Sequence, residues 1–256
     1  MSVLYIVATP IGNLEDISIR ALRVLGEVDF ILCEDTRVTA KLLAHYNIKT
    51  PAISYHQHSS EAKVNEIVTI LAGGKNLALV SDAGTPGISD PGGKLIQAVL
   101  EKLDGEAQIE SVPGPSAVTA ALSISGIPTD KFIFMGFPPH KKGRQTFIKK
   151  IVQSEFPVVV YESKHRIIKF LEELEKISLA TPDLAKPDNN QYPISNKISN
   201  DKLQISKKTN LTSVVVVREL SKMHETVYRG SLESIIKKIT ADKNDQKGEF
   251  VVIVGK

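Results

Sequence analysis

The feature that most constrains this chain is a regular alternation of short β-branched apolar runs with longer segments of helical period. In the first half, the runs at 3–8, 30–33, 77–80 and 109–112 alternate with helical patterns at 16–25, 36–46, 61–71 and 93–103. Parallel strands need crossover connections of this length, so the pattern indicates a mainly parallel sheet. We therefore expect an N-terminal α/β domain over residues 1–125.

The second half repeats the alternation with different spacing. It has expected strands at 132–135, 158–161, 214–217, around Val227 and at 250–254, and expected helices at 144–152, 166–177 and 232–239. Residues 126–256 are therefore predicted to form a second α/β domain. Within it, the composition of 178–212 shifts to Asn, Pro, Ser and Lys, which predicts a polar surface insertion.

Composition excludes several classes of protein. An apolar share of 42% and a charged share of 24% are typical of globular proteins rather than disordered ones. No basic leader precedes the first expected strand and no apolar run reaches bilayer length, so we expect a cytoplasmic protein without a membrane segment. The single cysteine, Cys33, cannot form an internal disulfide and is expected to be a buried structural thiol.

Charge is distributed unevenly along the chain. Up to Val118 there are 9 basic and 14 acidic residues, and after it 23 basic and 15 acidic, so the halves carry −5 and +8. Clustered Lys and Arg bind polyanions by releasing counterions from phosphates, which would suit a nucleic acid. An ordinary lysine-rich surface gives the same count, and charge alone leaves both interpretations open.

Three loops rich in glycine and proline follow expected strands, at 9–13, 82–92 and 113–117. Ligands bind at the carboxyl edge of open parallel sheets, where glycine lets the backbone approach them closely. Three such loops on one edge predict a ligand cleft. The sequence has neither G-x-G-x-x-G after the first strand nor a phosphate-binding G-x-x-x-x-G-K-[ST], so these residues leave the kind of cofactor open.

Charged residues also stand where expected strands meet helices. Glu34, Asp35 and Arg37 follow the second strand, where Asp35 suits either an N-cap or catalysis. The segments 140–144 and 161–166 suit either phosphate contacts or solvated turns. His56-Gln57-His58 has no further ligands at metal-site spacing, so no metal is expected.

Together these motifs resemble the tetrapyrrole-methylase superfamily, and within it most closely the bacterial 16S ribosomal RNA (cytidine-2′-O)-methyltransferases. The resemblance runs over nearly the whole chain and is carried by the segments 8–14, 34–37, 81–92, 112–117, 161–166, 218–220 and 248–249. It implies two α/β domains with S-adenosylmethionine in the cleft between them, a homodimer, and methylation of small-subunit ribosomal RNA, in the assembled subunit. The assigned acceptor is the 2′-oxygen of a cytidine ribose.

The resemblance and the chemistry together nominate three groups of residues. Cofactor contacts carried over from the family are Pro10, Gly12, Asp82, Gly84, Thr85, Ile88, Ser116, Ala117 and Tyr161. A ribose hydroxyl is a weak nucleophile that needs a proton acceptor, which nominates Glu34, Asp35 and Glu162, with Arg37 orienting a carboxylate. Phosphate contacts are expected at Lys141, Lys142, Arg144, His165 and Arg166.

Two departures from the family pattern are visible. Lys164 stands where the family usually has a proline, and the polar insertion at 178–212 replaces a short connection. Two other functions remain open. One is a methyltransferase of the same superfamily that acts on a tetrapyrrole or a protein side chain, and the other is a non-catalytic RNA-binding module. The Glu-Asp-Thr-Arg motif at 34–37 and the basic second half favour the RNA enzyme.

Overall fold

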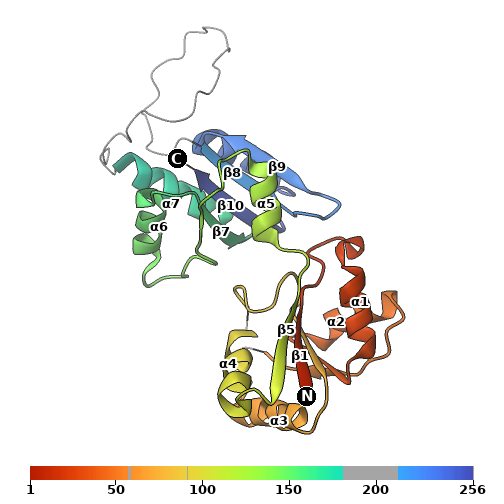
Figure 1. Ribbon diagram of the computed structural model, residues 1–256. Helices are drawn as coiled ribbons and strands as arrows, with labels where there is room; N and C mark the ends of the chain where they lie inside the picture. Colours follow the sequence, from red (N-terminus) through yellow and green to blue (C-terminus); the bar gives the residue numbers. More distant parts are fainter. Residues whose placement is uncertain (57–58, 91, 181–212, 256) are drawn as a thin grey trace. The chain divides into compact units, whose positions relative to one another are not determined.

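The computed structural model describes residues 1–56, 59–90, 92–180 and 213–255 (Figure 1). Contacts divide the chain into two compact units, Met1–Ala120 with Leu220–Met223, and Ala121–Glu219 with His224–Lys256. The division falls within helix α5 (Ala117–Ser125), close to the predicted boundary after Ser125. The tetrapeptide 220–223 belongs to the first unit by its contacts, whereas the prediction of two contiguous domains placed it in the second.

The first unit contains a five-stranded parallel sheet. Its order is β3 (Ala52–Ser54), β2 (Phe30–Cys33), β4 (Leu77–Val80), β1 (Ser2–Val7) and β5 (Ala107–Val112). Val7 is in register with Val80 on one side and with Val112 on the other. The carboxyl ends of β4, β1 and β5 therefore lie together along one edge of the sheet, as the predicted parallel sheet requires.

Helices cover both faces of this sheet. α1 (Ile19–Glu27) and α2 (Thr36–His45) bury apolar side chains in one cluster, and α3 (Glu61–Ala72) and α4 (Gly92–Leu103) in the other. Alternate residues of β2 and β4 join opposite clusters, which explains why these two strands are apolar throughout rather than alternating. Cys33 is fully buried in the first cluster, as expected.

Serine and aspartate side chains set where several helices begin. The Ser18 hydroxyl accepts a hydrogen bond from Ala21 N at 3.0 Å, so α1 begins at Ile19. The predicted start at Asp16 was wrong, because a separate 3-10 turn, η1 (Leu14–Asp16), precedes the cap. Ser60 caps α3 in the same way.

The second unit contains a mixed sheet. Its order is β6 (Ile133–Phe134), β7 (Val158–Ser163), β10 (Glu249–Gly255), β8 (Ser213–Arg218) and β9 (Thr226–Gly230). Only β6 and β7 pair in parallel, whereas β7–β10, β10–β8 and β8–β9 are antiparallel. The central strand β10 is buried from Phe250 onward, consistent with its unbroken apolar run.

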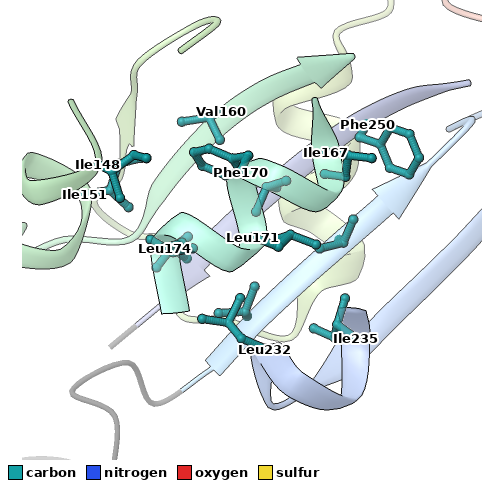
Figure 2. Close-up of a cluster of buried hydrophobic side chains, with 14 of the residues drawn as sticks. Ile148, Ile151, Val160, Ile167, Phe170, Leu171, Leu174, Leu232, Ile235 and Phe250 are labelled. Carbon is teal, nitrogen blue, oxygen red and sulfur yellow. The ribbon is translucent and has the colours of Figure 1, made fainter. Parts of the chain in front are cut away.

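α6 (Arg144–Gln153), α7 (Ile167–Ala180) and α8 (Leu232–Ala241) pack onto this sheet. Figure 2 shows Phe170, Leu171 and Leu174 of α7 within the core cluster that joins these helices to the strands. α7 includes residues 178–180, which are the first three residues of the predicted insertion. Its remaining part, 181–212, lies outside the described residues. In the described part of the chain, no helix is both long and apolar enough to span a bilayer.

Candidate functional site

Three loops leave the carboxyl ends of β1, β4 and β5, and hydrogen bonds lock them together. Thr9 N donates to Gly84 O at 2.9 Å and Gly84 N donates to Thr9 O at 3.0 Å, which forms an antiparallel bridge. The Thr9 hydroxyl donates to Ser81 O at 3.0 Å, and the Thr85 hydroxyl donates to Pro115 O at 3.2 Å. The predicted convergence of these loops on one sheet edge is therefore confirmed.

The loop after β4 is also fixed from within. Gly84 and Gly87 have φ of 87° and 85°, in the left-handed region that favours glycine. The Asp90 carboxylate accepts hydrogen bonds from Gly87 N and, at 3.3 Å, from Gly92 N. A Cβ at Gly92 would lie 2.8 Å from Gly87 N, so the fold brings the two ends of this turn into direct backbone contact.

A pair of acidic residues follows β2 at the same edge. Asp35 N donates to Asp82 Oδ1 at 3.2 Å, which joins this corner to the loop after β4. Asp35 caps α2 by accepting from Arg37 N at 2.9 Å, and Arg37 Nη2 lies 2.6 Å from its Oδ2. The N-cap interpretation of Asp35 is thus confirmed.

The two neighbouring carboxyl groups have opposite pKa shifts. Hydrogen bonds from Arg37 lower the pKa of Asp35 to about 2. Burial raises the pKa of Glu34, and the negative charges of Asp82 and Asp90 raise it further. A proton acceptor works best when its pKa lies near the working pH, so Glu34 suits that role better than Asp35.

Most of the predicted cofactor residues lie on the locked loops. Asp82 is exposed and Ile88 is 49% exposed, which is unusual for an isoleucine on a loop fixed from both ends. Gly84 is buried, and the Thr85 hydroxyl donates to the neighbouring loop. The others are half-buried or exposed and belong to the first and third loops: Pro10, Gly12, Ser116 and Ala117. Tyr161 lies on β7, in the second unit.

Gly12 contacts a segment that sequence reasoning missed. A Cβ at Gly12 would collide with the side chain of Lys222 and would lie 3.1 Å from Leu220 O. The Ser221 hydroxyl also donates to Asp16 Oδ2. The tip 220–223 therefore packs against the first loop, and the absence of a Cβ at Gly12 permits this close approach.

A buried ion network stands at the carboxyl end of β7. The Glu162 side chain is fully buried, with Arg166 Nη2 at 2.8 Å from Oε1 and Arg144 Nη1 at 3.6 Å from Oε2. Arg144 Nε is also 2.6 Å from Glu173 Oε2. Glu162 was nominated as a proton acceptor, but its burial between two guanidinium groups gives it a structural role here.

The predicted phosphate contacts divide into exposed and internal residues. Lys141, Lys142 and His165 are exposed. Arg144 is only 5% exposed and is bound by carboxylates, so its prediction as a phosphate contact is corrected. Arg166 is partly buried against Glu162 and donates to a loop carbonyl.

A family model described as Tetrapyrrole (Corrin/Porphyrin) Methylases matches residues 3–236. The chain belongs to the tetrapyrrole methylase family.

Relatives within this family include proteins named Ribosomal RNA small subunit methyltransferase I. The one from Synechocystis is 41% identical, with the alignment covering 99% of this chain and 79% of that protein. The one from Thermotoga maritima is 37% identical, covering 99% of this chain and 98% of that protein. The expected resemblance to 16S ribosomal RNA methyltransferases is thereby confirmed.

Solved structures of tetrapyrrole methylases share the fold. A cobalt precorrin-4 methyltransferase superposes with a TM-score of 0.64 at 18% identity, covering 99% of this chain and 94% of that one. Uroporphyrin-III-C-methyltransferase from Thermus thermophilus gives a TM-score of 0.61 at 18% identity, covering 100% and 95%. At this identity the likeness confirms the two-domain α/β fold and carries no statement about substrate.

Sequence reasoning missed several residues of this tetrapyrrole methylase site. Asp90 shapes the loop after β4, and the Ser-Asp-Pro-Gly run around it is a turn signal that could have revealed its role. No local signal announced Glu173 or the tip 220–223, because their partners are distant in sequence. Among the described residues, no three His, Cys, Asp or Glu side chains gather as metal ligands. Two residues of the His56-Gln57-His58 segment, Gln57 and His58, lie outside the described residues.

Proposed function

We propose that this protein uses S-adenosylmethionine to methylate the 2′-oxygen of a cytidine ribose in 16S ribosomal RNA. The observation that carries the proposal is the alignment with ribosomal RNA small subunit methyltransferases over 98–99% of the chain at 36–41% identity. The two tetrapyrrole methyltransferase structures described above each share 18% identity with the chain, so an RNA acceptor is preferred to a tetrapyrrole.

The locked loops of the first unit fit S-adenosylmethionine. The exposed Asp82 carboxylate and the exposed apolar surface of Ile88 match a ligand with hydroxyls, a cation and a flat ring. Ser116 and Ala117 at the start of α5 would flank the adenosine. Bound there, the cofactor supplies a methyl group on a sulfonium.

The protein's own residues align the acceptor and remove its proton. Alignment of nucleophile and methyl group can contribute about 7–11 kcal/mol in favourable cases. Glu34 accepts the proton of the 2′-hydroxyl, because its raised pKa makes its carboxylate a better base than that of Asp35. Arg37 orients Asp35, whose carboxylate begins α2 and thereby fixes the backbone next to Glu34.

RNA binding falls to the second unit. Lys141, Lys142 and His165 are exposed and contact phosphates, while Arg144 and Arg166 support them from inside. We expect affinity for single-stranded RNA to fall with salt at a logarithmic slope of about 0.7 per phosphate contacted. We further propose a cytoplasmic homodimer that acts on the assembled small subunit. Sedimentation would test the dimer.

The decisive experiment supplies labelled S-adenosylmethionine with naked 16S RNA or with small subunits, and then maps the modified nucleoside. We expect label on a cytidine 2′-oxygen, with subunits the better substrate. Glu34→Gln should lower kcat and leave the cofactor Kd, measured by calorimetry, unchanged. A non-catalytic RNA-binding module would bind RNA without micromolar cofactor affinity, and label on a base or a protein would also defeat the proposal.

A further inference from the structure

One aromatic side chain on the second unit is unusually open. Phe137, immediately after β6, is 52% exposed, although its ring packs edge-on against Tyr161 with centroids 5.4 Å apart. Tyr161 in turn packs against Phe134 at 5.0 Å. Phe137 is therefore the outer member of an aromatic row, supported on one side and open to solvent.

The backbone around Phe137 is pinned at three successive places. Tyr161 N donates to Gly136 O at 3.0 Å. Arg166 Nη1 donates to Pro138 O at 3.0 Å, and Arg144 Nη1 donates to Pro139 O at 3.3 Å. Arg166 is ion-paired with the buried Glu162 at 2.8 Å, whereas Arg144 is held mainly by Glu173 at 2.6 Å and lies 3.6 Å from Glu162 Oε2.

Exposed basic residues follow this rigid segment and lie on the turn tied to it. His140, Lys141 and Lys142 follow it directly and are exposed. Lys164 and His165 are exposed on the next turn, which Arg166 ties to Pro138. Glu162 and Glu173 face inward and are paired with arginines. The exposed charged residues that follow Phe137 directly in the chain, Lys141 and Lys142, are cationic.

We infer that residues 136–143 form a stacking platform on which Phe137 holds an unpaired base of single-stranded RNA, with Glu162 as the positioning residue. Sequence-tolerant RNA binding combines an open aromatic ring with basic groups that follow the phosphates, and this segment presents both. The inference rests on the proposed function, because it names the element of the RNA substrate that the enzyme grips. A protein partner would not need the cationic surround.

The test uses the full chain and a short oligocytidylate carrying one 2-aminopurine. Phe137→Ala should weaken binding roughly 5- to 150-fold, the range that corresponds to loss of one stacked base, whereas Phe137→Tyr should bind like wild type. Phe156→Ala is the matched control. Phe156 is 37% exposed and lies just before the first residue of β7, whereas Tyr161 and Glu162 lie near the last. Its loss should therefore leave the affinity for RNA unchanged.

Salt dependence separates stacking from charge. Phe137→Ala should keep the wild-type slope of affinity against salt, while Lys141→Ala should reduce that slope by about 0.7. If Phe137→Ala binds oligocytidylate as tightly as wild type, or weakens S-adenosylmethionine binding in calorimetry instead, the platform is disproved. The proposed function fails separately, through a wild-type protein that does not methylate RNA.

The role of Glu162 requires a double-mutant cycle. Glu162→Gln should weaken RNA binding in the wild-type background but have little further effect in Phe137→Ala, because it acts through the position of that ring. Thermal unfolding establishes that both variants are folded at the assay temperature. Equal losses in both backgrounds would show that Glu162 acts only on general stability and would overturn its positioning role.

Discussion

The two units present the carboxyl ends of parallel strands in different ways. In the first unit, backbone groups lock the loops to one another, as in the paired amides and carbonyls of Thr9 and Gly84. In the second unit, side chains do this work, because Glu162 holds two arginines that clamp the carbonyls of the loop after β6. One edge therefore depends on the absence of Cβ atoms and the other on buried charge.

This difference suits the two ligands proposed. A nucleoside cofactor is bound largely by backbone groups. The loops that bind it must therefore come close to it and carry few projecting side chains. Single-stranded RNA is gripped by projecting lysines and an aromatic ring, which need a rigid base beneath them. The two edges should consequently respond to opposite kinds of substitution.

Removal of the buried charge should have the largest effect. Glu162→Ala leaves Arg166 without its carboxylate partner in the protein interior and leaves Arg144 with Glu173 alone, which is expected to cost about 3–5 kcal/mol of the free energy of unfolding. Urea denaturation measures this loss. Glu162→Gln keeps the volume and one acceptor and should lose less. A loss below about 1 kcal/mol for the alanine variant would mean that the network does not hold the second edge together.

Addition of one methyl group should damage the first edge. Gly92→Ala would place a Cβ 2.8 Å from Gly87 N and should destabilise the protein by about 1–3 kcal/mol. Its neighbour Gly93 has no atom within 4 Å of such a Cβ, so Gly93→Ala is the matched control and should stabilise by up to about 1 kcal/mol. Thermal unfolding would show the opposite signs, and equal shifts would contradict the backbone-contact explanation.

The sequence predicted the strands and helices with strong apolar patterns, but β3, α5 and the short η1 escaped it. β2 and β4 have the predicted limits because their runs end in turn or capping residues. β3 was missed, since its three residues include only one that is even half-buried. α5 was missed because it carries no charged residue to contrast with its apolar face. An element is recognised from its sequence when it is long enough and when its apolar and polar positions differ clearly. β3 is too short, and α5 has no charged residues to mark its polar face.

For the candidate site, the sequence located the edge but not the state of each side chain. The convergence of the three loops follows from the topology of a parallel sheet, and the Asp35 cap follows from local chemistry at the start of a helix. Burial of Arg144 depends on Glu173, which lies a full helix away, and a basic residue in a basic loop looks the same whether it faces solvent or core. The sequence therefore assigned Arg144 to phosphate incorrectly.

The smallest expected effect in free energy is the most informative about chemistry. Asp35, with a pKa of about 2 against a usual 3.8, stabilises the folded state above pH 3.8, and this contribution is lost as pH falls towards 2. Glu34 behaves oppositely. Its pKa is raised above 4.5, so the folded state favours the protonated form, and that contribution is lost as pH rises through the raised pKa.

Carboxyl-carbon NMR titration can resolve the two residues individually. Arg37→Ala should raise the pKa of Asp35 towards 3.8 and leave that of Glu34 in place, because the guanidinium is the main cause of the first shift only. Asp82→Asn should lower the pKa of Glu34 by removing a nearby negative charge. If Glu34 accepts the ribose proton, the acid limb of kcat/KM must follow its pKa downward in Asp82→Asn at saturating cofactor. An acid limb of kcat/KM that stays at the wild-type pH would exclude Glu34 as the base, even if the loops of the first unit are intact.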